Sequence, residues 1–556
     1  MSIDKDPARI RLEGEAMEWH LATIWDLVAE FLPENPAIAQ GEKIITWSEY
    51  ERRSACLASA FQELNLGHEG RVGILGHNSA EWLEAHYAAF KAGGIPFNVN
   101  YRYTEQELLY LLDDADAEII VADAKLMPRV LAIRDRLPLL KACIAIEDGS
   151  RTSKLDNTED FESLIATHQP LTPRCYFGDE LYMLYTGGTT GMPKGVLYRQ
   201  SDFTRLLMKG FATIGSIPRS KSEIIAALHE LQKADLTPLT LPASPFMHGS
   251  GMALGAIVPH IMGGQVLIQR NEKFDAVNMW REVERARVTD IAIVGDAFAK
   301  PMVAALNEAE AQGRPFDLSS LRAISSSGMV FSQDNKLELL RFADIIIADM
   351  MSASEGTMGR SIVSRASPPE NSSTFERNPS TKVFNEQDEE VRPGSDEIGM
   401  IATGGIVPVC YHKDQAKSAA TFRSINGVRY SFPGDYAKIA ADGSLILLGR
   451  GSNCINTGGE KVFCEEVEEA LKAHPCVEDC LVIGTPDDRF GHSIVAVLST
   501  SGGEPIPSEL MDFCRSQIAG YKTPRRIIIV ETVQRGPNGK ADYGWAHRLA
   551  IEKQIA

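Results

Sequence analysis

The chain has 556 residues, of which an ordinary 44% are hydrophobic, and its formal net charge is −19. This length exceeds what one hydrophobic core supports, so we expect a globular protein of at least two domains. The strong negative charge argues against a nucleic-acid partner, because such a partner needs a basic surface.

Three further features concern the compartment and membranes. Nine cysteines are scattered without a C-x-x-C pair, which is typical of reduced thiols in a cytoplasmic protein. The first residues are charged and lack an apolar run, so we expect no signal peptide. Residues 236–269 contain no Asp, Glu, Lys or Arg, but prolines and glycines interrupt them. A membrane span is therefore not expected, and this segment is predicted to form a buried strand-and-loop wall of a pocket.

Hydrophobic patterning predicts alternating helices and strands from residue 20 onward. The predicted helices cover residues 20–31, 80–92 and 280–287, and the predicted strands cover residues 71–76, 118–122, 290–295, 321–324 and 344–348. Two polar segments, residues 149–173 and 365–380, are predicted to be surface loops. The alternation is typical of α/β layers.

A smaller unit is predicted after residue 450. A strand over residues 443–449 ends the first unit. The predicted elements that follow are a helix over residues 465–473 and strands over residues 480–484, 493–498 and 526–530. We therefore divide the chain into residues 1–450 and a small α+β domain of residues 451–556.

Residues 185–196 read YTGGTTGMPKGV and carry the strongest functional signal of the chain. The candidate phosphate-binding residues are Thr186, Gly187, Gly188, Thr189, Thr190, Gly191 and Lys194. Glycines let a ligand approach the backbone, and successive amides can form an anion-binding nest. The threonine hydroxyls and the lysine add donors and positive charge, which suits a polyphosphate.

Two other readings of this segment are weaker. A plain surface turn rarely needs so many special residues in a row. A P-loop of the Walker type has its lysine directly before Ser or Thr at a helix start, whereas Lys194 follows Pro193 and precedes Gly195. The segment instead resembles the phosphate loop of the adenylate-forming superfamily of acyl-CoA synthetases, luciferases and adenylation domains. The resemblance covers nearly the whole chain, and further motifs follow in the family's order.

The resemblance implies an α/β fold and a two-step reaction. A large N-terminal domain of βαβ layers with a small barrel-like subdomain is expected to carry a small, mobile α+β lid. In the first step a small-molecule carboxylic acid and ATP, with Mg²⁺, give acyl-AMP and pyrophosphate. In the second step coenzyme A takes the acyl group and AMP leaves. The oligomeric state is left open between a monomer and a homodimer.

The resemblance assigns the adenine site to the end of a predicted strand. Ser327, Gly328 and Met329 stand in the segment SSSGM, where small residues would let a flat base lie against the backbone. An ordinary strand-loop turn is the alternative for this string alone.

The next motif, DMMSASE over residues 349–355, resembles the family's Y-G-x-T-E. Asp349, Met350 and Ser354 are therefore candidate nucleotide contacts, and Glu355 is the candidate catalytic carboxylate and Mg²⁺ ligand. Met351 stands where the family has its tyrosine, so stacking on the adenine is lost at that position.

Three charged residues complete the adenylation set by resemblance. Asp435, in FPGD, would accept hydrogen bonds from the ribose hydroxyls, and Arg450 would also reach the ribose. Lys540, in RGPNGK, matches the family's catalytic lysine and would stabilise charge that builds on the α-phosphate. Lys194, Glu355 and Lys540 are thus the predicted catalytic residues.

Four residues are assigned to the acyl and CoA side of the site. His248, in PFMHG, matches a family motif beside the acyl pocket, although a buried core histidine is the alternative reading. Gly458 and Gly459 match a hinge motif whose glycines would let the pantetheine arm pass close to the backbone. Lys522 lies in the basic stretch YKTPRR and could meet CoA phosphates, with a solvated surface as the alternative.

Within the superfamily, residues 293–300, 428–435 and 520–524 most resemble actinobacterial ligases of steroid side-chain acids or fatty acids. The expected substrate is accordingly a large apolar acid. A carrier-loading enzyme or a luciferase-like enzyme would share the first half-reaction and remains the alternative. A non-catalytic nucleotide-binding module is disfavoured because Glu355 and Lys540 are both retained.

Overall fold

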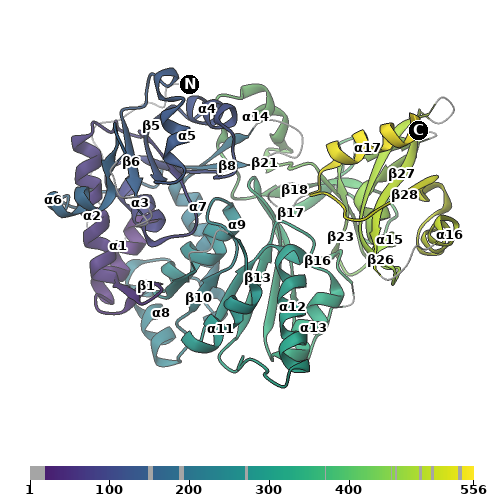
Figure 1. The fold of residues 1–556 in the computed structure, drawn as a ribbon, viewed down its shortest axis with the longest axis horizontal. Helices are drawn as coiled ribbons and strands as arrows, with labels where there is room; N and C mark the ends of the chain where they lie inside the picture. Colours follow the sequence, from purple (N-terminus) through teal and green to yellow (C-terminus); the bar gives the residue numbers. More distant parts are fainter. Residues whose placement is uncertain are drawn as a thin grey trace.

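The fold is mixed α/β, with a large N-terminal part and a smaller C-terminal part that lies at the right of Figure 1. The computed structural model describes residues 19–147, 155–186, 193–269, 273–369, 371–451, 454–457, 460–487, 491–501, 506–535 and 541–555. This arrangement confirms the expected fold class.

A parallel sheet forms the first layer of the N-terminal part. Its strands, in spatial order, are β4 (Ile95–Val99), β3 (Arg71–Leu75), β5 (Ala117–Asp123), β6 (Ala142–Ile146) and β7 (Glu159–Asp160). Such parallel strands are buried on both faces and read as continuous apolar runs, which is why residues 71–76 and 118–122 were recognisable in the sequence. The helices of this region are α1 (Leu21–Phe31), α2 (Trp47–Glu63), α3 (Ala80–Lys91), α4 (Glu105–Asp114), α5 (Met127–Leu131) and α6 (Phe161–Thr167).

A second, longer sheet runs through the middle of the molecule (Figure 1). Its first strands, in spatial order, are β2 (Lys43–Thr46), β1 (Pro36–Gln40), β11 (Gln265–Ile268), β10 (Leu239–Pro242), β12 (Asp290–Ile293), β13 (Ala323–Ser327), β14 (Ile346–Ala353) and β15 (Gly356–Val363). The neighbouring strands β1, β11, β10, β12, β13 and β14 are parallel, and β15 runs antiparallel to β14. The helices α11 (Ala276–Ala286), α12 (Gly295–Ala311) and α13 (Gln333–Phe342) share a hydrophobic core with this sheet.

The sheet continues into antiparallel strands that border the C-terminal part. These are β16 (Thr374–Arg377), β23 (Leu445–Arg450), β22 (Asp435–Ile439), β18 (Gly399–Gly404), β21 (Val428–Ser431) and β20 (Phe422–Ile425), with β17 (Thr381–Phe384) paired to β18. A separate small sheet joins β8 (Leu181–Thr186), β9 (Lys194–Arg199) and β19 (Cys410–Tyr411). The remaining helices of the N-terminal part are α7 (Gln200–Leu207), η2 (Met208–Ile214), α8 (Lys221–Lys233), α9 (Gly249–Met252), η3 (Ala253–Ile257), α10 (Val258–Ile261) and α14 (Gln415–Thr421).

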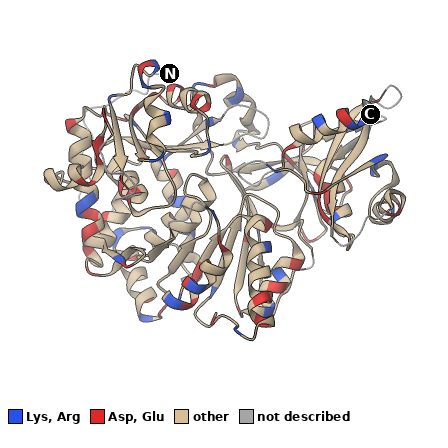
Figure 2. Ribbon diagram, viewed as in Figure 1, with Lys and Arg blue, Asp and Glu red and all other residues tan. Residues whose placement is uncertain are grey.

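The C-terminal part has its own hydrophobic clusters, whose buried residues all lie between Ile455 and Ala550. Its strands are β24 (Cys454–Thr457), β25 (Glu460–Phe463), β26 (Val477–Asp487), β27 (Gly491–Thr500) and β28 (Arg526–Val530), and its helices are α15 (Cys464–Lys472), α16 (Pro507–Gln517) and α17 (Tyr543–Ile555). The predicted elements of this part are confirmed. Figure 2 shows acidic and basic residues intermixed along outer helices such as α12 and α13.

The two predicted surface loops contain regular structure and were wrong in that respect. Helix α6 lies within residues 149–173, capped by Asp160 and buried through Phe161, Leu164 and Ile165. Strand β16 lies within residues 365–380 and pairs with β15 and β23. Both elements are too short to show a period in the sequence, so tertiary pairing decides them.

Candidate active site

One large cavity of about 1510 Å³ lies where β13, β14, the β8–β9 hairpin and helix α9 meet. It brings together predicted residues from four distant stretches of the chain. The predicted residues that line it are Thr186, Lys194, His248, Ser327, Gly328, Met350, Ser354 and Glu355.

The β8–β9 hairpin presents the ends of the predicted phosphate loop to this cavity. Thr186 is the last residue of β8 and pairs with Lys194, the first residue of β9. The antiparallel ladder behind them runs back to Leu181 and Arg199, so both ends of the loop are held in register. The other loop candidates, Gly187, Gly188, Thr189, Thr190 and Gly191, lie outside the described residues.

Lys194 is held by a carboxylate and an aromatic ring. Its Nζ lies 3.1 Å from Oδ2 of Asp414 and 5.6 Å from the ring centroid of Tyr411. Asp414 also caps α14 by accepting from the amide of Lys417. The Lys417 amide and the Lys194 ammonium together hold the pKa of Asp414 below its usual range. Both charged side chains are about a third exposed, so a phosphate could compete for the lysine.

Glu355 lies in the turn between β14 and β15 and is positioned by a tyrosine. The hydroxyl of Tyr411 donates a 2.7 Å hydrogen bond to Oε1 of Glu355, and Tyr411 is buried. The preceding residue is fixed as well, because the hydroxyl of Tyr198 donates to the carbonyl of Ser354 at 2.9 Å. The carboxylate therefore faces the cavity in a defined orientation.

These residues fit a magnesium ion that is shared with phosphates. Among the described residues there is no group of three or more His, Cys, Asp or Glu side chains able to hold a metal. Mg²⁺ commonly binds through one or two carboxylates together with substrate phosphates and water. Glu355 beside Thr186 and Lys194 offers that single carboxylate at the place where phosphates are expected.

Strand β14 divides its side chains between two faces. Ala348, Met350 and Ser352 face the cavity, as period-two alternation requires. Asp349 does not line the cavity: it is buried against Lys336, with Nζ to Oδ2 at 2.7 Å. Burial raises the pKa of Asp349, and the Lys336 ammonium opposes that shift. The Asp349 carboxylate thus forms a structural ion pair, and the assignment of Asp349 to the nucleotide stays a prediction.

Two of the methionines discussed above, Met351 and Met329, do not line the cavity. Met351, at the family's tyrosine position, is buried in a small cluster with Met358 and Phe375, while Met350 lines the cavity. A register shift between Met351 and Ser352 accompanies this arrangement. Met329 is not among the lining residues, whereas Ser327 and Gly328 before it are. Gly328 has φ +96°, a conformation that favours glycine.

The ribose candidates lie on adjacent strands. Asp435 opens β22 and stands opposite Arg450, the last residue of β23. Asp435 is buried, and nothing is described of the Arg450 side chain. The neighbouring residues Gly434 and Tyr436 line the cavity, so this end of the ladder borders it.

The uncharged segment is the expected wall, but it is helical. Residues 236–269 form β10, a continuous helical stretch from α9 through the π-helical η3 to α10, and then β11. His248 is the residue directly before α9, and it lines the cavity. Pro259 lies within this stretch, two residues after the π-helical η3, so the proline does not end the helix here.

The glycines of this wall serve different purposes. A Cβ at Gly251 would lie 2.1 Å from the carbonyl oxygen of Pro245, and one at Gly255 would lie 2.6 Å from Cβ of Pro242. These two glycines permit close packing rather than cavity volume. Gly249 has no atom within 4 Å of its Cβ position and lines the cavity, as do Ser250 and Ala253.

Of the predicted residues of the C-terminal part, the structure describes Lys522, which does not line the cavity. Nζ of Lys522 lies 2.5 Å from Oε1 of Glu466, and the lysine side chain is largely buried. Its charge is therefore neutralised within the C-terminal part. Gly458, Gly459 and Lys540 lie outside the described residues.

Comparison with protein-family models decides the family. The AMP-binding enzyme model matches residues 26–406, and the model of the AMP-binding enzyme C-terminal domain matches residues 466–540. The chain belongs to the AMP-binding enzyme family. The two matches lie on either side of the predicted boundary at residue 450, which itself stays a prediction.

Curated relatives of this AMP-binding enzyme are CoA ligases. The chain is 38% identical over 541 residues to the 3-oxocholest-4-en-26-oate--CoA ligase of Rhodococcus rhodochrous, covering 95% of this chain and 96% of that protein. It is 37% identical to the medium/long-chain-fatty-acid--CoA/3-oxocholest-4-en-26-oate--CoA ligase of Mycobacterium tuberculosis, covering 96% of both chains. A crystal structure of an anthranilate CoA ligase with anthranoyl-AMP has the same fold, with a TM-score of 0.82, 20% identity, and coverage of 97% and 99%.

Sequence reasoning missed several residues that shape the site of this AMP-binding enzyme. They are Tyr198, Tyr411, Asp414, Lys417 and Tyr436. Tyr411 sits on the two-residue strand β19, which pairs with β9. Its only local signal is an aromatic residue three positions before an Asp that begins a short helix, which is a weak helix-capping pattern.

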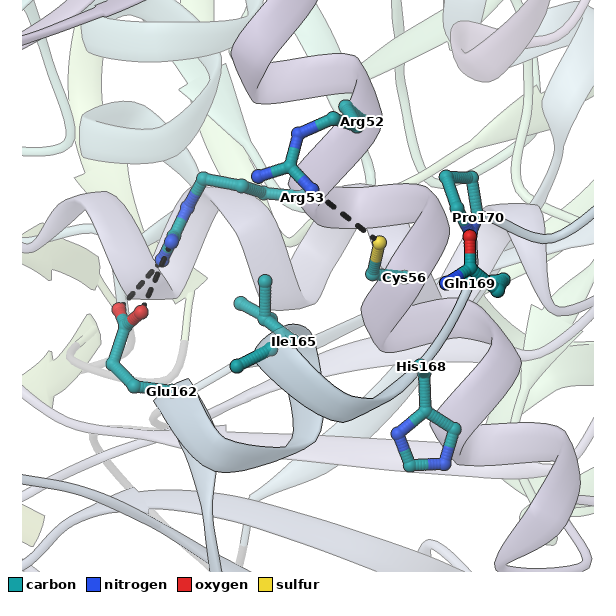
Figure 3. Close-up of a pocket in the computed structure, with 9 residues that line it drawn as sticks. Arg52, Arg53, Cys56, Glu162, Ile165, His168, Gln169 and Pro170 are labelled. Atoms are coloured by element: carbon teal, nitrogen blue, oxygen red, sulfur yellow. Dashed lines mark hydrogen bonds and ion pairs between the residues drawn. The ribbon is translucent and has the colours of Figure 1, made fainter.

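A smaller hollow of about 240 Å³ lies between α2 and α6, and Figure 3 shows it. Arg53 is fixed there by Glu84, at 2.7 Å, and by Glu162, at 2.6 Å. Arg52 lies 3.8 Å from Sγ of Cys56 and is paired with Glu49. Both guanidinium groups are thus occupied by partners from the chain, and the hollow is a product of helix packing.

No helix within the described ranges is both long and apolar enough to cross a membrane.

Proposed function

We propose that this chain is an AMP-forming acid–thiol ligase, which activates a carboxylic acid with ATP and transfers the acyl group to coenzyme A. The observation that carries the proposal is the convergence of Thr186, Lys194 and Glu355 on one cavity with Ser327 and Gly328. A cavity of about 1510 Å³ exceeds the usual range for a single small ligand, so it has room for a nucleotide and an acid.

In the first half-reaction a carboxylate oxygen of the acid attacks the α-phosphorus of ATP, and pyrophosphate leaves. Lys194 and the threonines of the loop bind the β and γ phosphates, and Lys540 stabilises the charge on the α-phosphate and the carboxylate. Glu355 would hold Mg²⁺, which neutralises phosphate charge when bound. Ser327, Gly328 and Met350 contact the adenine, while Asp435 and Arg450 bind the ribose.

In the second half-reaction the thiolate of CoA attacks the acyl carbonyl, and AMP leaves. Residues 451–556 act as a lid that presents Lys540 for the first step and the loop of Gly458 and Gly459 for the second. His248, which lines the cavity, is assigned to the acyl group, and Lys522 reaches CoA phosphates only if its pair with Glu466 opens.

The substrate is a large apolar acid, either a steroid side-chain acid or a medium- or long-chain fatty acid. The names of the relatives support this class. The cavity supports it as well, because residues such as Leu236, Val258 and Met262 line it. A cytoplasmic location and a monomeric or homodimeric state stay predictions.

The test is AMP release by the purified chain with ATP, Mg²⁺ and CoA across acetate, octanoate, palmitate, benzoate and 3-oxocholest-4-en-26-oate. We expect AMP release that depends on CoA, with kcat/KM highest for a long-chain or steroid acid. AMP release with no thioester product would instead support the carrier-loading or luciferase-like alternative. Highest kcat/KM for acetate would contradict the substrate class.

A further inference from the structure

The cavity does not end at the nucleotide residues but extends along one face of the long sheet. Alternate residues of β13, namely Ala323, Ser325 and Ser327, line it, and so do Ile346, Ala348, Met350 and Ser352 of β14. Because side chains on one face recur every second residue, these strands expose the same face over their length. Ser327 and Ala323 are four residues apart, so this face spans roughly 13 Å.

The apolar part of this extension is incompletely covered and reaches the amino ends of the strands, where Ile346 stands opposite Ala323. Ile346 is 51% exposed, Ile362 is 49% exposed and Leu236 is 40% exposed, and all three line the cavity. Large exposed apolar side chains that gather in one concave surface mark a binding site rather than ordinary surface. The face joins the nucleotide end without interruption, so its occupant is the apolar body of the acid that is activated there.

The far end is polar, at the amino ends of β12 and β13. Arg322 and Asp290 both line the cavity there, and Nη2 of Arg322 lies 3.7 Å from Oδ2 of Asp290. The guanidinium also donates to the carbonyls of Asp235, at 2.6 Å, and Thr237, at 3.2 Å. These contacts fix the guanidinium in place, and the side chains of Arg322 and Asp290 each remain about a third exposed.

A guanidinium carries five N–H donors, so the hydrogen bonds to Asp235 and Thr237 and the 3.7 Å ion pair with Asp290 leave donors for another acceptor. An apolar end of a substrate placed against this pair would remove water from two charged groups without replacing its hydrogen bonds. A carbonyl or hydroxyl oxygen at the same place would restore a hydrogen bond to Arg322. Asp290 could in turn accept from a hydroxyl, since Oδ2 already accepts from Thr289 and Oδ1 is the second acceptor.

We propose that Arg322, oriented by Asp290, is a specificity-determining residue that binds an oxygen at the end of the acid opposite its carboxylate. The inference rests on the proposed acyl-CoA ligase function and deepens it. Binding to Arg322 distinguishes between acids of similar size: a steroid acid with an oxo or hydroxyl group on its far ring is preferred over the same skeleton without that oxygen.

The experiment compares kcat/KM for 3-oxocholest-4-en-26-oate with that for the acid lacking the 3-oxo group, by AMP release with the full chain. The wild-type enzyme should prefer the oxo acid by about tenfold or more, which is the effect of one hydrogen bond to a charged donor. Arg322→Met should reduce this ratio to about one while kcat/KM for the deoxygenated acid changes little. Arg322→Lys keeps a cationic donor and should retain part of the preference.

Arg287→Met is the matched control, because Arg287 pairs with Asp317 at 3.5 Å on the surface and does not line the cavity. It should leave the ratio unchanged. A wild-type ratio near one overturns the proposal, and this result does not depend on whether any variant folds. An unchanged ratio in a folded Arg322→Met enzyme overturns it as well. Absence of CoA-dependent AMP release with both acids and with palmitate would instead contradict the proposed function.

Discussion

The hydroxyl of Tyr411 donates a 2.7 Å hydrogen bond to Oε1 of Glu355, and the same ring lies 5.6 Å from Nζ of Lys194. One buried aromatic side chain therefore touches both the candidate metal ligand and the lysine of the phosphate loop. Because Tyr411 lies on a strand that pairs with β9, the hairpin and the carboxylate are held as one assembly.

Tyr411→Phe should weaken the use of Mg²⁺ in adenylation. The variant keeps the ring but leaves Glu355 without its orienting donor, so we expect about tenfold slower ATP–pyrophosphate exchange at limiting Mg²⁺. Raising the Mg²⁺ concentration should restore part of the rate. Tyr198→Phe is the control, because its hydroxyl donates to the backbone of Ser354 and not to the carboxylate. Equal Mg²⁺ dependence in both variants would remove the role assigned to Tyr411.

Lys194→Ala should slow adenylation by roughly tenfold to a hundredfold, because one cationic donor to the phosphates is lost while the backbone of the loop remains. Pyrophosphate exchange measures this step directly. Lys413→Ala provides the comparison, since Lys413 pairs with Asp116 at 2.8 Å and does not line the cavity. If pyrophosphate exchange is unchanged in Lys194→Ala, the lysine does not bind the phosphates, and its role is limited to the ion pair with Asp414.

Lys540→Ala should lower adenylation by roughly a hundredfold or more and spare thioester formation from supplied acyl-AMP. Charge builds on the α-phosphate only in the first step, so only adenylation should slow in Lys540→Ala. Gly459→Leu should have the opposite effect, slowing thioester formation and sparing adenylation, because a bulky side chain would obstruct the pantetheine path. Loss of both half-reactions to the same degree in Lys540→Ala would contradict the assignment.

Gly251→Ala should destabilise the protein by about 1–3 kcal/mol, because its Cβ has no room beside Pro245. Gly249→Ala, two residues earlier in the same helix, should leave the melting temperature nearly unchanged. Thermal unfolding of the two variants side by side measures the difference. A similar melting temperature for both would show that the wall relaxes around Gly251.

His260 should make the fold less stable in acid. It is buried beside Trp47 and hydrogen-bonded to the carbonyl of Ala37 at 3.0 Å, and burial lowers its pKa to about 4 from an ordinary value of 6.5. Between pH 6.5 and 4 the unfolded chain binds a proton that the folded chain does not. Stability attributable to this group is therefore complete above pH 6.5 and falls as the pH is lowered through that window, by at most roughly 1.4 kcal/mol per pH unit.

His260→Gln should flatten this acid slope in melts recorded from pH 7 to pH 4.5. The difference between variant and wild type is the informative quantity, because Glu84 acts in the opposite direction. Burial raises the pKa of Glu84 to about 7, so protonation of that group favours the folded state as the pH falls. Parallel slopes for the two proteins would mean that His260 is protonated in the folded state.

The core strands were predictable from the sequence, and eight of the candidate site residues line the cavity, because both depend on local patterns. Strands such as β3 and β5 are continuous apolar runs, and the loop between Thr186 and Lys194 has a distinctive composition. The buried ion pair of Asp349 could not be predicted in this way. The side of the sheet that a strand presents depends on its register with its neighbours, and the sequence DMMSA does not alternate.

The role of Tyr411 could not be predicted from the sequence for a similar reason. Its contact with Glu355 joins residues 56 positions apart, and a two-residue strand leaves no period to detect. The helical wall was missed because glycines and prolines normally interrupt helices. Here close packing at Gly251 and Gly255 requires the glycines, which only the neighbouring Pro245 and Pro242 reveal.

The hydrogen-bonded ladder from β12 to β15 carries both ends of the cavity on one stiff surface, from Asp290 at one edge to Ser327 and the Glu355 turn at the other. The separation between the two ends is therefore built into the strand lengths and cannot adapt to each acid. The sheet therefore selects acids by the distance between the carboxylate and the far oxygen. An acid in which these groups are too close together can bind at only one end of the cavity, whatever its affinity for the apolar lining.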